Sequence, residues 1–148
     1  MSTTTDSDEP IRIAFMCVQN AGRSQLSTAF AERERERRGL EDRIEILTGG
    51  TAPAERVHEE VIEVTAEAGF DLSERTPREI SLEELRSCDV VATMGCSTLD
   101  VGDVGSDVDV RDWGLEDPDG RDLEAVREIR DEIEERVVAL FDEFSDAP

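Results

Sequence analysis

The segment CVQNAGRS, residues 17–24, holds the residues best suited to chemistry in this sequence. Five residues separate Cys17 from Arg23, and Ser24 follows directly. An apolar run precedes the segment and a helical pattern follows it, which predicts a loop that ends at the N-terminus of a helix. Backbone N–H groups turned into such a loop, together with the positive end of the helix dipole, form an anion-binding cradle.

The side chains of this segment suit attack by sulfur on a tetrahedral oxyanion. The positive field of the loop favours the thiolate of Cys17, which is the nucleophilic form. Arg23 offers a planar fork that matches two oxygens of the oxyanion, and Ser24 can donate a hydrogen bond to the sulfur. Asn20 tolerates a left-handed conformation that would close the loop. The alternative is a buried cysteine at a strand end beside a surface arginine. The predicted oxyanion-binding residues are Val18, Gln19, Asn20, Ala21, Gly22, Arg23 and Ser24.

A general acid is the next requirement, because an oxygen that leaves the oxyanion needs a proton. Candidates lie in the segment DWGLEDPDG, residues 112–120, before the last predicted helix. Asp117 stands out because Pro118 fixes the backbone beside it and Trp113 can anchor the segment on the core. In a chain with 38 acidic residues, the alternative is an ordinary Asp-Pro pair at a helix start.

The hydrophobic pattern predicts the elements that must position these residues. Strands alternate with helices, and the last helix carries a long apolar stripe. Such alternation predicts an α/β fold, a three-layer α/β/α arrangement around a central four-stranded parallel sheet, with ligands bound at the carboxyl ends of the strands. A capping box at Ser81 opens one short helix. The strands are predicted at 11–16, 44–48, 88–94 and 107–111, and the other helices at 24–38, 54–68 and 123–144.

The composition is that of one folded and very acidic domain, predicted over residues 11–146 after a disordered tail at 1–10. The 148 residues include 38 acidic and 16 basic ones, for a formal net charge of −22, and every basic residue is arginine. This field repels nucleic-acid phosphates, so nucleic acid is excluded as a partner. It also suggests a halophilic protein, whose self-repulsion is screened by high salt.

Cysteine and histidine usage limits the redox and metal chemistry. The N-terminus is polar and no apolar run approaches the roughly 18 residues of a membrane helix, so we expect a cytoplasmic protein without membrane contact. In such a chain three cysteines indicate thiol chemistry rather than a disulfide scaffold. Cys88 and Cys96 with a single histidine, His58, do not make a four-ligand zinc site, and we expect no metal or other cofactor. His58 is expected to have a surface or structural role.

Taken together, these segments resemble the low-molecular-weight protein tyrosine phosphatase family and, within it, the arsenate reductases. The resemblance runs from residue 11 to about residue 140. It implies Cys17 as the nucleophile, Arg23 as the anion-binding arginine, Ser24 as the supporting hydroxyl and Asp117 as the general acid, with Asn20 ordering the loop. The segments that carry it are CVQNAGRSQ, TGGTAPAERVHEE, GFDLSERTPREIS, DVVATMGC, DWGLEDPDG and VREIRDEIEERV.

Two departures from the phosphatase branch favour arsenate as the substrate. Gln19 stands where tyrosine phosphatases of this family usually carry glycine, and the chain has no tyrosine to stack on a substrate ring. Arsenate reduction needs a second thiol, and the resemblance places Cys96 near the first position of a cysteine relay, whereas the second relay position lacks cysteine. Cys88 is predicted at the far end of its strand, roughly 20 Å from Cys17. The relay is therefore either shortened to Cys17–Cys96 or completed by an external thiol.

Three functions remain open at this point. The first is reduction of arsenate to arsenite through a thiol–arsenate adduct on Cys17, with a thioredoxin-type, glutaredoxin-type or small-thiol reductant. The second is hydrolysis of phosphate monoesters through a phosphocysteine intermediate. The third is a non-catalytic oxyanion-binding or redox-sensing protein.

Overall fold

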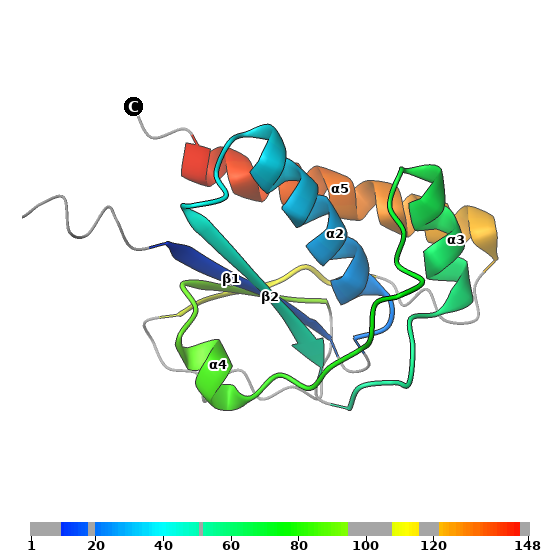
Figure 1. The fold of residues 1–148 in the computed structure, drawn as a ribbon, viewed down its shortest axis with the longest axis horizontal. Coiled ribbons are helices and arrows are strands. Elements are labelled where there is room, and N and C mark those ends of the chain that lie inside the picture. Colours follow the sequence, from blue (N-terminus) through cyan, green and yellow to red (C-terminus); the bar gives the residue numbers. More distant parts are fainter. Residues whose placement is uncertain (1–9, 18–19, 51, 95–107, 116–121, 146–148) are drawn as a thin grey trace, which may run out of the picture.

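Four strands form one parallel sheet in the computed structural model of the chain (Figure 1). The sheet order is β2 (Ile44–Gly50), β1 (Ile11–Cys17), β3 (Val90–Thr93) and β4 (Asp109–Asp112). All three pairings are parallel, so the carboxyl ends of the strands meet at one edge of the sheet. The structure describes residues 10–17, 20–50, 52–94, 108–115 and 122–145.

Helices cover both faces of this sheet, unequally. The helices α2 (Arg23–Arg37), α3 (Glu59–Glu67) and α5 (Leu123–Ser145) lie together on one face, and the short α4 (Leu82–Arg86) lies on the other (Figure 1). The three-layer α/β/α arrangement around a four-stranded parallel sheet is therefore confirmed.

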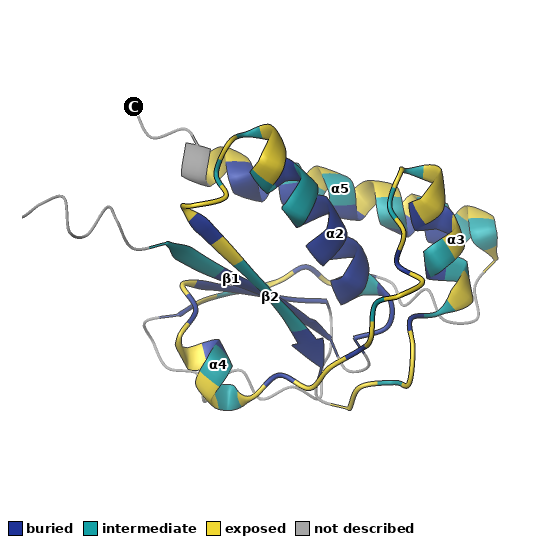
Figure 2. Cartoon of the chain, viewed as in Figure 1, coloured by how far each residue is buried: buried dark blue, intermediate teal, exposed yellow. Residues whose placement is uncertain are grey.

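Two hydrophobic clusters hold the layers together. Alternate side chains of a strand point to opposite faces, so Ile13, Phe15 and Cys17 pack toward α2 and α5 in the larger cluster. Ala14 and Met16 pack toward α4 in the smaller one. The inner sides of α2 and α5 are buried along this contact (Figure 2). Cys17 therefore lies on the face of the sheet that carries the three longer helices.

Two element boundaries differ from the sequence prediction. The second long helix begins at Glu59 rather than at residue 54, because the chain before it runs along the carboxyl edge and the His58 N–H donates to the Ala21 carbonyl at 2.9 Å. The third strand begins at Val90, so Cys88 precedes the strand instead of belonging to it. Most of the predicted disordered tail, residues 1–9, lies outside the described residues.

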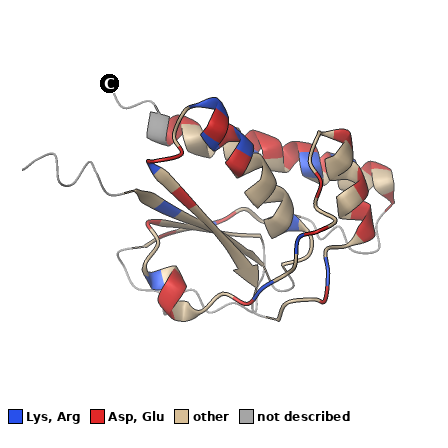
Figure 3. Cartoon of the chain, viewed as in Figure 1, with Lys and Arg blue, Asp and Glu red and all other residues tan. Residues whose placement is uncertain are grey.

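Acidic residues outnumber basic ones along the ribbons of α3 and α5 (Figure 3). Among the helices that the structure describes, none is both long enough and apolar enough to cross a membrane.

Candidate active site

Cys17 is the last residue of β1, and Arg23 is the first residue of α2. The connecting loop therefore lies at the carboxyl edge of the sheet, where the sequence placed it. Residues 18 and 19, with the predicted binding residues Val18 and Gln19, lie outside the described part of the chain. Cys17 is buried, with 4% of its surface exposed.

The N-terminus of α2 suits an anion better than any other helix start in the structure. Its first turn contains no acidic residue, although α3, α4 and α5 each have at least one there. The residue before it, Gly22, provides no side-chain cap. A helix start without a cap or a carboxylate leaves its N–H groups and its positive dipole end to a ligand.

Two donors converge on the sulfur of Cys17. The backbone N–H of Asn20 donates to Sγ at 3.2 Å, and Ser24 Oγ lies 3.1 Å from Sγ. Ser24 Oγ also accepts a hydrogen bond from Asn20 Nδ2 at 2.7 Å, and its own hydrogen can be donated to a thiolate. Hydrogen bonds to the charged form favour that form. Both groups are within hydrogen-bond distance of the sulfur.

Asn20 is the centre of the loop. It adopts a positive φ of 51°, the left-handed conformation that the sequence predicted. Its side-chain N–H groups donate to Ser24 and, at 2.8 Å, to Thr48 Oγ1 of β2. Its Oδ1 accepts from the backbone N–H of Arg78 at 3.0 Å and from Gln25 Nε2 at 3.1 Å. Every donor and acceptor role of this amide is thus used to hold the loop.

Sequence reasoning missed Thr48, Arg78 and Gln25. Thr48 and Arg78 are 28 and 58 positions from Asn20, and nothing in the linear pattern marks contacts at that separation. Gln25 does carry a signal, because it is a polar residue in the first turn of a helix that starts inside the protein. The Arg78 side chain donates to the Thr48 carbonyl and pairs with Glu84 at 2.7 Å.

The Glu84 carboxylate connects this edge to α4. The Ser81 backbone N–H, followed by the Arg78 guanidinium, lowers the pKa of Glu84 below its usual range. Ser81 and Glu84 form the capping box that the sequence predicted, with both reciprocal hydrogen bonds present.

The guanidinium of Arg23 lies across the ends of β3 and β4. Its Nη1 donates to the carbonyl oxygens of Met94 and Leu115, the latter at 2.9 Å. In the sequence, Met94 and Leu115 are each two residues ahead of a predicted catalytic residue, Cys96 and Asp117 respectively. Both of those residues lie outside the described part of the chain. The structure thus brings Cys17, Asn20 and Ser24 together through hydrogen bonds, while the Arg23 guanidinium bonds to the chain after β3 and β4.

The remaining thiol of the described residues, Cys88, is remote from Cys17. It packs in the smaller cluster on the opposite face of the sheet and donates to the Glu84 carbonyl at 3.3 Å. Burial raises the pKa of the Cys88 thiol, which keeps it protonated and a poor nucleophile. The next residue, Asp89, bonds to Arg12 near the start of β1. Cys88 therefore has the core role that the sequence predicted.

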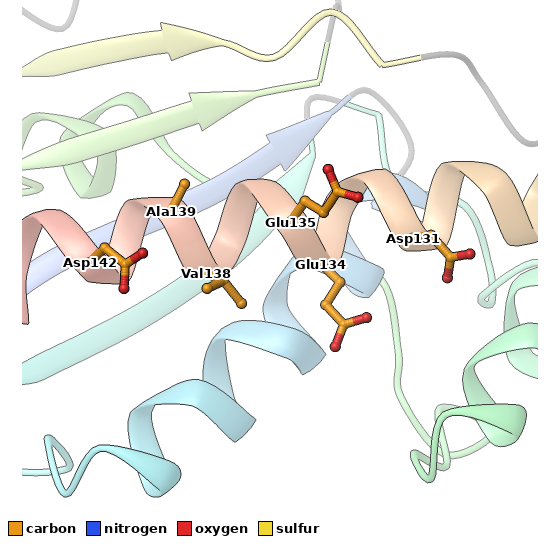
Figure 4. Close-up of a pocket in the computed structure, with 6 residues that line it drawn as sticks. All are labelled: Asp131, Glu134, Glu135, Val138, Ala139 and Asp142. Carbon is orange, nitrogen blue, oxygen red and sulfur yellow. The ribbon is translucent and has the colours of Figure 1, made fainter.

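The other candidate sites in the described residues are less suited to binding an oxyanion or a metal ion. A depression of about 580 Å³ runs along α5 and is lined by four carboxylates, which would repel an oxyanion (Figure 4). Among the described residues no group of three His, Cys, Asp or Glu side chains is arranged to hold a metal ion. His58 contacts the loop through its backbone N–H. The residues that line the depression are Asp131, Glu134, Glu135, Val138, Ala139 and Asp142.

The sequence and the fold of this chain are both similar to those of known proteins. A family model described as low molecular weight phosphotyrosine protein phosphatase matches residues 12–147. A Halobacterium salinarum protein, whose assignment as an arsenate reductase is provisional, is 70% identical over 93% of this chain and 96% of its own length. The glutaredoxin arsenate reductase of Synechocystis is 31% identical over 90% of this chain and 98% of its own. A solved arsenate reductase in the phosphate-binding state has a TM-score of 0.76 and 29% identity, covering 91% of this chain and 99% of that one.

Proposed function

The chain belongs to the low molecular weight phosphotyrosine protein phosphatase family, and on that premise we propose that it reduces arsenate to arsenite with Cys17 as the nucleophile. The observation that carries the proposal is the sulfur itself, held at an uncapped helix start with hydrogen-bond donors from Asn20 and Ser24. The relatives named as arsenate reductases decide which oxyanion is favoured.

In the proposed first step, the Cys17 thiolate attacks the arsenic of bound arsenate. A sulfur–arsenic bond forms and one arsenic–oxygen bond breaks. The N–H groups of the loop, residues 18–24, and the Arg23 guanidinium neutralise the oxyanion charge. Asp117 gives its proton to the departing oxygen, which leaves as water.

In the second step, the Cys96 thiolate attacks the Cys17 sulfur. The new disulfide forms as the sulfur–arsenic bond breaks, and its electron pair stays on arsenic, so As(V) becomes As(III) and leaves as arsenite. An external thiol reductant, of the thioredoxin, glutaredoxin or small-thiol class, then supplies two electrons to open the disulfide. Arg23 bonds to the Met94 carbonyl. Cys96 follows Met94 by only two residues in the sequence, which supports Cys96 as the resolving thiol.

Arsenite formation by the purified chain, with dithiothreitol as reductant in KCl-rich buffer, tests this proposal. The wild type is expected to form arsenite, and Cys17→Ser to form none. Cys96→Ser is expected to lose turnover. Its oxyanion loop should remain intact, so bound phosphate should still protect Cys17 from alkylation in this variant. Cys88→Ser is the matched control, since it makes the same change in the thiol on the opposite face and should keep wild-type turnover. Undiminished turnover of Cys96→Ser would contradict the second step.

Phosphate monoester hydrolysis is the second candidate, favoured by the family to which the chain belongs. Both reactions share the attack by Cys17, and they differ in whether water or sulfur resolves the adduct. Hydrolysis of an aryl phosphate, assayed on the same sample, separates them. A rapid hydrolysis that Cys96→Ser leaves unchanged, without arsenite formation by the wild type, would establish the phosphatase instead.

A further inference from the structure

The side chain of Gln25 is buried against the centre of the anion loop, with 1% of its surface exposed. It lies in the first turn of α2, next to Ser24, and its Nε2 donates to two oxygens of Asn20. One is the backbone carbonyl and the other is Oδ1, both at 3.1 Å. No role in the reaction described above requires Gln25, because it touches neither the sulfur nor the predicted position of the oxyanion.

These two bonds fix both halves of Asn20. The bond to Oδ1 orients the side chain that donates to Ser24 and Thr48. The bond to the carbonyl fixes the peptide plane that leads from Asn20 into Ala21, within a loop that depends on the left-handed φ of 51° at Asn20. The Asn20 N–H, one of the two donors to the Cys17 sulfur, belongs to the same residue.

The orientation of the Gln25 amide has one solution. Turning it over would place Oε1 against two acceptor oxygens of Asn20, which is repulsive. In the orientation observed, Oε1 is buried and has no hydrogen-bond partner among the described residues. An unpartnered buried acceptor is unfavourable, so the bonds to Asn20 decide how this side chain is placed.

We propose that Gln25 is a positioning residue that holds Asn20 in its left-handed conformation and thereby directs the Asn20 N–H at the Cys17 sulfur. This role of Gln25 rests on the proposed function in one respect only, which is that Cys17 is the nucleophile of the reaction. It concerns the loop itself, so it can be tested without turnover.

The test measures the rate of Cys17 alkylation by iodoacetamide as a function of pH, with and without inorganic phosphate, and locates the alkylated cysteine by peptide mass spectrometry. Gln25→Met keeps a similar volume and removes the donor. We expect the midpoint of its alkylation profile to move to higher pH and its phosphate affinity to fall about tenfold, the equivalent of one hydrogen bond.

Thr28→Val is the matched control. Thr28 is also buried in α2, and its hydroxyl donates to the Ser24 carbonyl at 2.7 Å without touching Asn20. Removing it should lower stability while leaving the alkylation profile and phosphate affinity unchanged. Gln25→Glu is a second variant, which keeps the shape but places a carboxylate against the Asn20 oxygens, and it should shift the profile at least as far as Gln25→Met.

A merely structural role for Gln25 would lower the free energy of unfolding in both variants and leave the profile at its wild-type position, which would overturn the inference. Failure of both variants to fold, with Thr28→Val folded, would overturn it as well. If the wild type binds phosphate yet forms no arsenite, the proposed function fails while the Gln25 comparison is still decided by alkylation.

Discussion

The sulfur of Cys17 is controlled by residues on both sides of the loop. Asn20 presents its backbone N–H, and Ser24 presents a hydroxyl that also accepts a hydrogen bond from the Asn20 side chain. The loop therefore places two hydrogen-bonding groups on the sulfur that the proposed reaction uses as its nucleophile.

Ser24→Ala tests this point at the residue scale. Removing the hydroxyl deletes a hydrogen bond to a charged group, worth about 1.5–3 kcal/mol, so we expect Cys17 alkylation near neutral pH to slow by roughly 10- to 100-fold. Ser27→Ala is the control, because Ser27 is a buried hydroxyl of the same helix that donates to the Arg23 carbonyl at 2.8 Å instead. Equal rates in the two variants would contradict the role of Ser24.

At the scale of elements, the loop depends on contacts that join distant segments. The chain from Arg78 to Ile80 runs beside the end of β2, where it exchanges backbone hydrogen bonds of 2.9 and 3.1 Å with Gly50. This pairing positions the Arg78 backbone N–H to donate a hydrogen bond to Asn20 Oδ1. The floor of the site is therefore built by β1, β2, α2 and the segment before α4 together.

Gly49→Ala tests this contact. A Cβ at position 49 would lie 2.4 Å from the Cβ of Ile80 and 3.0 Å from its backbone nitrogen, so the neighbouring segment must move. We expect a loss of about 1–3 kcal/mol in the free energy of unfolding, together with weaker phosphate binding as the Arg78 N–H moves from Asn20. Adding Ile80→Gly removes the closest contact and also a buried side chain, so the double variant should lose less stability than the sum of the two single losses. Strict additivity of the two substitutions would contradict the argument.

The contact between α3 and α5 makes a separate prediction about pH. Arg127, followed by Arg130, lowers the pKa of Glu67 from 4.5 to about 2. A carboxylate with a lowered folded-state pKa stabilises the protein above its unfolded value and loses that contribution as the pH falls toward its folded value. Urea unfolding of Glu67→Gln should thus differ from the wild type above pH 5 and converge with it as the pH falls to about 2.

Glu63→Gln provides the control for that experiment. Glu63 is exposed on the same helix, and its charge acts on Arg127 without the close ion pairs that Glu67 makes with Arg127 and Arg130. Its stability relative to the wild type should not follow the same pH window. A Glu67→Gln difference that stays constant from pH 6 to pH 3 would contradict the assignment.

The sequence was sufficient for most of the elements and for the position of the loop between β1 and α2, because both depend on local order. Strand, loop and helix succeed one another within residues 11–38, and hydrophobic spacing marks each of them. It was insufficient where the chain is positioned by distant partners. The late start of α3 follows from the His58 bond to Ala21, and the anchoring of Asn20 depends on Thr48 and Arg78.

At the scale of the whole molecule, the charge surplus is the dominant feature. Arginines of the described residues pair with many acids, as in the contacts of Arg111 with Asp109 and Glu143. However, 38 acidic residues cannot be balanced by 16 arginines, and the net charge is −22. The resulting repulsion opposes folding at low ionic strength, where the Debye length is long.

We therefore expect the free energy of unfolding to rise with KCl concentration. Urea unfolding from low to molar KCl measures the trend, and sucrose in place of KCl is the control, because it strengthens burial without screening charge. Full stability in low salt, or an equal gain in sucrose, would remove the self-repulsion argument.

The central claim is that sulfur resolves the adduct on Cys17, and a single turnover without external reductant tests it most directly. The fully reduced chain is mixed with excess arsenate, and released arsenite, remaining free thiols and disulfide-linked peptides are quantified. Because reduction of As(V) to As(III) takes two electrons and one disulfide supplies them, we predict one arsenite per chain, the loss of two of its three thiols and a Cys17–Cys96 disulfide. No arsenite, with all three thiols still free, would contradict the account.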